Sequence, residues 1–296
     1  MNAGTIPVAD LSGGFDLRAT LESGQTFLWL RDDGRAYEGT DPTDGSAWYY
    51  TVTDGEVVRV RQRDVLLEWE ATFDADRLLV GRLRLDDDLP AIFEAIPDDP
   101  LLAEARDAYS GLRLVDDPFF PCLVSFICSA QMRVERIHGM CTRLAEQYGD
   151  SVTFDGDTYF AFPTPDQLAA ATEADLRDLS LGYRAPYVQR TAEMVADGEA
   201  APAAAREYEY EDAREYLTQF VGVGDKVADC ILLFSLDFLE AVPLDTWIQT
   251  AIEDYYPDCD GSDYAETSRR IRRQFGDRYA GYAQTYVFFY LRTGGE

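Results

Sequence analysis

Short apolar and polar runs alternate along roughly the first 115 residues, with turn residues between them. Residues 26–30 read Thr-Phe-Leu-Trp-Leu, an Asp-Asp-Gly turn follows at 32–34, and further apolar runs stand at 48–52 and 57–60. This alternation, broken by tight-turn residues, is typical of antiparallel strands joined by hairpins. We therefore predict an antiparallel β-rich domain over residues 1–115.

From Asp117 onward the apolar positions recur at helical spacing. Asp117 is a favourable N-cap, and Pro118 suits the first position of the helix that follows. Later helices are predicted near residues 133–148, 165–180, 186–197, 211–219, 226–237, 246–255, 264–275 and 280–292. The sequence thus predicts an α+β fold in which a helical domain over 116–296 follows the β-rich one.

The composition is strongly acidic: 55 Asp and Glu against 26 Lys and Arg give a formal net charge of -29. Duplex binding draws much of its affinity from Lys and Arg on phosphates, so the charge alone argues against a nucleic-acid partner. An acidic surface also keeps proteins soluble in a salt-rich cytoplasm. Because all but one of the 26 cations are arginine, we favour a halophilic prokaryote with a GC-rich genome. Local cations then say more about partners than the net charge.

Cysteine and histidine usage limits the chemistry. Five cysteines without a C-x-x-C pair, and one histidine (His138), argue against a disulfide framework, a zinc site or an iron–sulfur site. We expect no metal and no cofactor in the reacting centre. No apolar run approaches the ~20 residues of a membrane helix, and residues 1–10 do not read as a signal peptide. We expect a soluble, cytoplasmic protein.

The only lysine, Lys226, follows a glycine hairpin at the start of a predicted helix. Residues 220–230 read Phe-Val-Gly-Val-Gly-Asp-Lys-Val-Ala-Asp-Cys, so a helix ends near Phe220 and Asp225 can cap the next one. A helix-hairpin-helix of this kind presents backbone N–H groups that suit a phosphate oxygen. For an isolated Gly-x-Gly, a plain helical hairpin is the better interpretation.

The choice of lysine over arginine favours a chemical role at this position. An arginine stays protonated, whereas a lysine amine can become a neutral nucleophile when it is desolvated or placed near a positive helix end. The alternative is a surface lysine that survived by chance. Cys230 lies one turn further on, so its thiol shares a helix face with the amine.

Asp245 follows an apolar run and precedes another predicted helix. An ordinary N-cap is the default interpretation of such an aspartate. In an apolar surround the same carboxylate could face a cleft and stabilise a developing positive charge. The two interpretations are compatible.

Five stretches, in order along almost the whole chain, make the sequence resemble the 8-oxoguanine DNA glycosylase/lyase family of helix-hairpin-helix glycosylases. They are residues 222–230 followed by Val242-Pro243-Leu244-Asp245, the stretch Ser23-Gly24-Gln25-Thr26-Phe27-Leu28-Trp29, the stretch 126–129 (Phe-Ile-Cys-Ser), the stretch 181–185 (Leu-Gly-Tyr-Arg-Ala) and the stretch 279–284 (Tyr-Ala-Gly-Tyr-Ala-Gln). The resemblance implies base excision repair of DNA that contains oxidised guanine, by a monomeric enzyme associated with the nucleoid.

The resemblance also implies roles in the chemistry. Lys226 would attack C1′ of an extruded nucleotide and form a Schiff base, and Asp245 would stabilise the sugar's positive charge. The Gly24 carbonyl would accept the N7 hydrogen that 8-oxoguanine has and guanine lacks. Residues that resemble the rest of the substrate pocket are Cys230, Pro243, Gln284 and Phe288.

Contacts with the duplex are implied in the same way. Gln131 would fill the gap left by the extruded base, Tyr183 would wedge the stack, and Arg136 and Arg184 would read the opposite cytosine. The hairpin residues Gly222, Val223 and Gly224 would hold a phosphate through their main chain, in the family with a bound monovalent or calcium ion.

The sequence departs from the family pattern at three places. Gln131-Met132-Arg133 stands where the family has an Asn-rich stretch, Val221 replaces the hairpin proline, and Trp247 replaces a phosphate-contacting histidine. The arginine-rich run at 269–273 could supply the missing phosphate contact, and a solvated helix face explains it equally well. In high salt, stacking and base-edge contacts should carry more of the affinity.

Two other functions fit the same scaffold. A monofunctional alkylpurine glycosylase would activate water with the aspartate and lack the lysine, so Lys226 argues against it. A non-catalytic helix-hairpin-helix DNA-binding module would need neither Lys226 nor Asp245, nor the Gly24 match in a separate domain.

Overall fold

The computed structural model describes residues 1–38 and 47–294. Its N-terminal part contains an antiparallel sheet of strand order β1-β5-β4-β3-β2. The strands are β1 (Asn2–Pro7), β2 (Leu30–Arg31), β3 (Tyr49–Thr53), β4 (Glu56–Arg63) and β5 (Leu66–Ala71). The predicted runs at 48–52 and 57–60 become β3 and β4, which pair with Val52 opposite Val57. The antiparallel sheet predicted from the alternation is confirmed.

Among the described residues, four short helices also lie in the N-terminal part, at positions that the sequence pattern of this β-rich domain did not predict. They are α1 (Leu17–Glu22), α2 (Asp76–Arg82), α3 (Leu89–Glu94) and α4 (Pro100–Ala108). Aspartates at positions 16, 88 and 99 cap three of them. The run at 26–30 is strand only at its last residue, and β2 continues to Arg31.

Helices make up most of the chain after Asp117. They are α5 (Phe119–Cys128), α6 (Val134–Tyr148), α7 (Pro165–Ala169), α8 (Glu173–Asp178), α9 (Ala185–Ala196), α10 (Tyr210–Leu217), α11 (Asp225–Ser235), α12 (Thr246–Tyr255), α13 (Tyr264–Gln274) and α14 (Ala280–Thr293). A hairpin of β6 (Ser151–Phe154) and β7 (Asp157–Phe160) lies among them, and short 3-10 helices occur at 8–10, 182–184, 202–207, 257–259 and 277–279.

Two details of the predicted helical pattern are wrong. The helix predicted over 165–180 is two helices, because the Thr172 hydroxyl accepts from Asp175 N and starts α8 as a separate helix. Asp117 does not cap α5, whose N-cap is Pro118 without a side-chain cap bond. The hairpin of β6 and β7 was not predicted.

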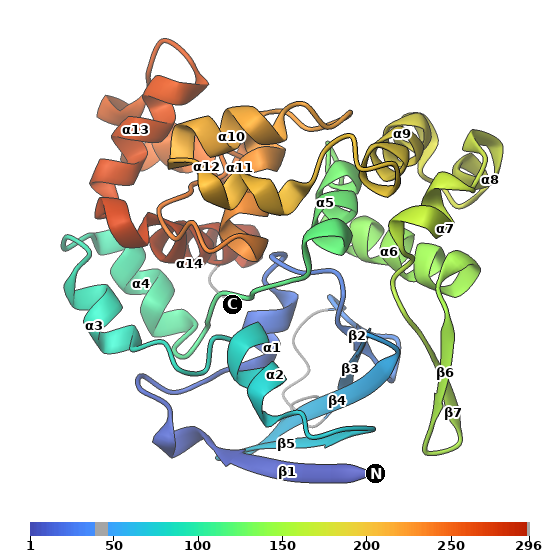
Figure 1. The fold of residues 1–296 in the computed structure, drawn as a ribbon. Coiled ribbons are helices and arrows are strands. Elements are labelled where there is room, and N and C mark those ends of the chain that lie inside the picture. The colour runs from blue at the N-terminus through green and yellow to red at the C-terminus, as the bar shows by residue number, and fades with distance from the viewer. Residues whose placement is uncertain (39–46, 295–296) are drawn as a thin grey trace.

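The sheet lies at one end of the molecule and α10–α13 lie at the other, with α14 between them (Figure 1). One hydrophobic core cluster runs through both parts and includes Leu67 of β5, Leu123 of α5 and Tyr286 of α14. The β6–β7 hairpin reaches back to the sheet, where the Asp155 carboxylate accepts from Arg59 at 2.8 Å. The division of the chain into domains 1–115 and 116–296 stays a prediction.

Candidate active site

Lys226 stands in the first turn of α11, directly after the glycine hairpin. Its side chain is half-buried, its Nζ donates to the Ser129 hydroxyl at 3.3 Å, and the amine lies 5.7 Å from the centre of the Phe126 ring. Both contacts come from the end of α5, so α5 and α11 together fix where the amine points. In residues 1–38 and 47–294 no carboxylate forms a salt bridge with it.

Asp245 is the N-cap of α12, and its carboxylate accepts from Ile248 N at 2.9 Å. The capping interpretation is therefore confirmed. Burial raises the pKa of this carboxyl, and the nearby Lys226 charge is the first of the influences that oppose the rise. The Asp245 carboxylate thus caps α12 and also interacts electrostatically with the Lys226 amine, so the two interpretations of Asp245 from the sequence are compatible.

A cleft of about 780 Å³ contains both groups. Its size is typical of a ligand-binding pocket. Five of the predicted site residues line it, namely Gly24, Gln131, Lys226, Asp245 and Phe288. Trp247, which is 38% exposed, lines the same cleft.

A smaller pocket of about 40 Å³ lies next to the cleft. It shares Gly24, Lys226, Asp245 and Phe288 with the cleft, and the remaining predicted substrate residues Cys230, Pro243 and Gln284 line it as well. A space of this size has room for only a few water molecules. Side chains around the pocket must therefore move before a purine ring can enter.

Gly24 has a backbone conformation that favours glycine, with φ +98°. A Cβ at this position would lie 3.1 Å from Val134 Cγ1 and 3.4 Å from the Phe288 ring. Any side chain at position 24 would strain the backbone. It would also narrow the smaller pocket of about 40 Å³, which we call the inner pocket.

Cys230 and Gln284, two further polar residues of the pocket, are neutral. Burial raises the pKa of the Cys230 thiol to about 12, against the influence of the Lys226 charge, so the group stays a thiol at neutral pH. Gln284 is buried, and its Oε1 accepts from the Thr285 hydroxyl at 3.2 Å.

Two of the residues predicted to contact the duplex, Tyr183 and Arg184, meet at the carbonyl of Ala130. Tyr183 is half exposed and donates to this carbonyl at 3.3 Å, and the Arg184 guanidinium donates to it as well. Gln131 is exposed, with φ +54°. Arg136 is exposed on α6, beside Gly139 and Arg143 in a separate surface hollow outside the main cleft.

Arg184 differs from the expectation that it is free to read a base. The side chain is 2% exposed, and its guanidinium stacks 4.3 Å from the Tyr183 ring. Its Nε is buried without a hydrogen-bond partner in the described part of the chain. Reading a base with Arg184 requires the side chain to leave this position, because its polar atoms are covered in this structure.

The hairpin between α10 and α11 has the geometry that the glycines predict. Gly222 has φ +89°, and a Cβ there would come within 2.9 Å of Tyr187. Val223 N donates to Phe220 O at 3.1 Å, and nothing lies within 4 Å of where a Gly224 Cβ would stand. The N-cap of α11 is Gly224 and not Asp225, whose carboxylate instead lies 3.7 Å from Arg214. The open backbone at Gly224 leaves room for an anion at the helix start.

Arg292 belongs to the cleft and was missed by the sequence reasoning. Its Nη2 donates to Glu22 O at 2.6 Å, while Nη1 is buried without a hydrogen-bond partner among the described residues. The guanidinium lies 5.7 Å from the centre of the Phe288 ring. The spacing could have predicted this residue, because Arg292 stands four positions after Phe288 and so lies on the same face of α14.

The arginine-rich run on α13 does not reach the cleft. Arg269 and Arg272 contact Glu211, and Arg270 contacts Glu266. None of these side chains lines the cleft. The solvated-face interpretation fits this arrangement better than a replacement for the phosphate contact at Trp247.

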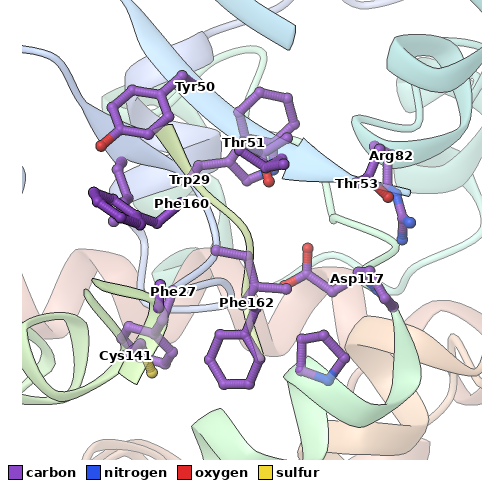
Figure 2. A pocket seen from close by; sticks show the side chains of 16 residues that line it. Phe27, Trp29, Tyr50, Thr51, Thr53, Arg82, Asp117, Cys141, Phe160 and Phe162 are labelled. Carbon is purple, nitrogen blue, oxygen red and sulfur yellow. The ribbon is translucent and has the colours of Figure 1, made fainter. Parts of the chain in front are cut away.

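Another cavity of about 40 Å³ lies between the sheet and the helical part. Figure 2 shows Tyr50, Trp29 and Phe160 on one side of it, and Asp117 near Arg82 on the other. Burial raises the pKa of Asp117 to about 7, and a hydrogen bond from Thr26 only partly opposes this rise. The cavity holds none of the predicted site residues.

Metal ligands do not cluster in this chain: among the described residues, no group of three or more His, Cys, Asp and Glu could hold a metal ion. An ion at the hairpin would have to bind main-chain carbonyls. Of these, Val221 O already accepts from the Thr191 hydroxyl and Phe220 O from Val223 N. The ion therefore stays a prediction. No helix in the described part is long and apolar enough to span a membrane.

Comparisons with known proteins give two matching family models that adjoin each other. Residues 8–123 match the 8-oxoguanine DNA glycosylase N-terminal domain, and residues 124–276 match the HhH-GPD superfamily of base excision DNA repair proteins. A probable N-glycosylase/DNA lyase of Methanothermobacter thermautotrophicus is 32% identical, over 98% of this chain and 96% of that protein.

Solved structures give the same result. MBOgg1 in complex with a low-affinity DNA ligand superposes with a TM-score of 0.86 at 29% identity, over 100% of this chain and 97% of that one. The 8-oxoguanine glycosylase/lyase of Clostridium acetobutylicum, bound to duplex DNA with cytosine opposite 8-oxoG, has a TM-score of 0.81 at 28% identity. That match covers 95% of this chain and 93% of the other.

Proposed function

Because the chain belongs to the 8-oxoguanine DNA glycosylase family of HhH-GPD base excision repair proteins, we propose that it excises 8-oxoguanine from duplex DNA and cleaves the strand through Lys226. It is a DNA glycosylase with AP lyase activity. One observation carries the roles of its residues: Lys226 and Asp245 line the cleft and the inner pocket together with Gly24.

The amine and the carboxylate divide the chemistry. The neutral Lys226 amine attacks C1′ of the extruded nucleotide as the glycosidic bond breaks. The base leaves with the bonding electrons and takes up the proton that the attacking nitrogen loses. Asp245 stabilises the positive charge that develops on the sugar. The resulting aminal opens to a Schiff base, from which β-elimination expels the 3′ phosphate. No cofactor is needed, since the chain supplies both groups.

The inner pocket selects the base. The Gly24 carbonyl accepts the N7 hydrogen of 8-oxoguanine, and guanine, which lacks this hydrogen, leaves the carbonyl unpaired. Phe288 stacks on the ring, the Gln284 amide contacts the pairing edge, and Cys230 and Pro243 close the opposite side. Since the pocket has only about 40 Å³ here, the base enters as these side chains move apart.

Duplex contacts surround this pocket. Gln131 fills the gap, Tyr183 wedges the stack, and Arg136 and Arg184 read the opposite cytosine once Arg184 leaves the Ala130 carbonyl. The main chain of Gly222, Val223 and Gly224 holds a phosphate, with a monovalent or calcium ion as the family pattern suggests.

The enzyme acts as a monomer on DNA in a halophilic prokaryotic cell. The 55 acidic against 26 basic side chains support the halophilic source. Activity should accordingly persist in molar KCl, where phosphate attraction is weak.

The direct test incubates the protein with duplexes that carry 8-oxoguanine, guanine or 7-methylguanine opposite cytosine. We expect release of 8-oxoguanine together with a nick that carries a 3′ unsaturated aldehyde. Release of 7-methylguanine with an intact abasic strand would identify the monofunctional alkylpurine enzyme instead. Binding without any base release would identify a non-catalytic DNA-binding module.

A further inference from the structure

The helix α11 that carries Lys226 also carries a buried carboxylate, Asp229. Asp229 stands three residues after the lysine in α11 and is fully buried. It accepts from the Tyr210 hydroxyl and from the Tyr264 hydroxyl, each at 2.7 Å, on its two different oxygens. The proposed chemistry uses none of these three residues.

Tyr264 makes one bond that Tyr210 does not make. Its hydroxyl oxygen accepts from the backbone N–H of Leu244 at 3.2 Å. Leu244 directly precedes Asp245, and its carbonyl accepts from Gln249 Nε2 at 3.3 Å. Hydrogen bonds therefore hold both polar groups of the Leu244 backbone.

We propose that Tyr264 is a positioning residue, whose hydroxyl joins the helix that carries Lys226 to the backbone that carries Asp245. The bonds form one chain, from Leu244 N–H to Tyr264 and from Tyr264 to Asp229. This inference rests on the proposed roles of Lys226 and Asp245.

Three physical arguments support the link. A hydroxyl that donates to a carboxylate is polarised and becomes a better acceptor, so the two bonds strengthen each other. Both partners of the hydroxyl are buried, so its loss leaves an unsatisfied N–H and an under-solvated carboxylate. Finally, a reacting pair tolerates little displacement, and an error of 1 Å can cost about a hundredfold in rate.

Charge around Asp229 is consistent with an acceptor role. Burial raises the pKa of Asp229 to about 7, and Arg214 and the two tyrosine hydroxyls oppose this rise. Arg214 Nη1 lies 3.8 Å from the carboxylate.

The test compares Tyr264→Phe with Tyr210→Phe. Each change removes one hydroxyl that donates to Asp229, but only Tyr264→Phe also frees Leu244 N–H. We expect Tyr264→Phe to lower the single-turnover rate of 8-oxoguanine release at least about tenfold, with lesion-DNA affinity within about twofold. Tyr210→Phe should lower the melting temperature comparably and leave the rate within about twofold. Equal rates for the two variants would overturn the proposal.

A double-mutant cycle with Asp245→Asn distinguishes a positioning role of Tyr264 from a general effect on stability. If Tyr264 acts through Asp245, Tyr264→Phe should cost nothing further in an Asp245→Asn background. A full tenfold loss in that background would also overturn the inference. If Asp245→Asn alone is as active as the wild type, the proposed role of Asp245 fails, so the two failures are distinguishable.

Discussion

Cations occur both in the cleft around Lys226 and along the outer face of α13, and the two regions use them differently. On α13, Arg269, Arg270 and Arg272 all contact carboxylates. In the cleft, Lys226 has no salt bridge in the described part of the chain, and Nη1 of Arg292 has no hydrogen-bond partner there. The number of cations therefore does not locate the site in so acidic a chain. What distinguishes Lys226 and Arg292 in the cleft is that neither forms a salt bridge among the described residues.

The largest effect is expected for Lys226→Gln. The amide cannot attack C1′, so the single-turnover rate of 8-oxoguanine release should fall by at least about 10⁴-fold, a loss typical of removing a nucleophile. Strand nicking should disappear, and lesion binding should stay within a few fold. A residual rate within tenfold of the wild type would mean that Lys226 is not the nucleophile.

Asp245→Asn should have the next largest effect. Asparagine caps a helix about as well as aspartate, so the fold is preserved while the charge that stabilises the sugar cation is lost. The rate of base release should fall by about 10²–10³-fold, with unchanged affinity for lesion DNA. Turnover at the wild-type rate would reduce Asp245 to a helix cap.

Gly24→Ala should separate base recognition from the sugar chemistry. The methyl group strains a residue with φ +98° and approaches Val134 and Phe288. We expect release of 8-oxoguanine to fall about tenfold or more, while nicking of a preformed abasic site changes less, because no base must enter. Equal losses on both substrates would contradict a role for Gly24 in base selection.

Asp117→Asn extends the comparison to a carboxylate that has no salt bridge in the described residues. Burial raises the pKa of Asp117 from 3.8 to about 7, so this group favours the folded state at low pH and loses that contribution as the pH rises through 7. The melting temperature of the variant should therefore gain on the wild type between pH 5 and pH 8, by roughly 2–4 °C per kcal/mol. Asp54→Asn on an exposed turn is the control, and a gain that does not change with pH would contradict the assignment.

Arg269→Gln should have the smallest effect. Its ion pair with Glu211 is exposed, and such pairs contribute about 0–1 kcal/mol. Base release and lesion binding should both stay within about twofold across the salt range. A salt-dependent loss of lesion affinity would instead assign the α13 arginines to the phosphate contact.

The sequence predicted the parts of the molecule that local rules determine. The helical spacing placed α6 and α9–α14 within one or two residues, and the two glycines predicted the hairpin. The family resemblance placed Gly24, Lys226 and Asp245 in one site, and the three residues do line one cleft. The local sequence pattern was sufficient for these helices, because the capping residues and the spacing of the buried positions indicate the same helix boundaries.

Residues whose partners lie far away in the sequence could not be predicted. The short helices α1–α4 bury few apolar positions each, so their periodicity is too short to detect. Arginine side chains are usually exposed, yet Arg184 is buried, because its guanidinium donates to the Ala130 carbonyl and packs against the Tyr183 ring. The Tyr264 link joins three elements, and no spacing along the chain indicates it.

The covalent bond between Lys226 and deoxyribose is tested most directly by borohydride trapping on an 8-oxoguanine:cytosine duplex, followed by mapping of the adduct. Lys226 is the only lysine among the 296 residues, so no other lysine side chain can form the adduct. We predict one cross-linked peptide, which contains Lys226 and is absent from Lys226→Gln. Release of the base without any adduct, or an adduct on a peptide that lacks Lys226, would contradict the account.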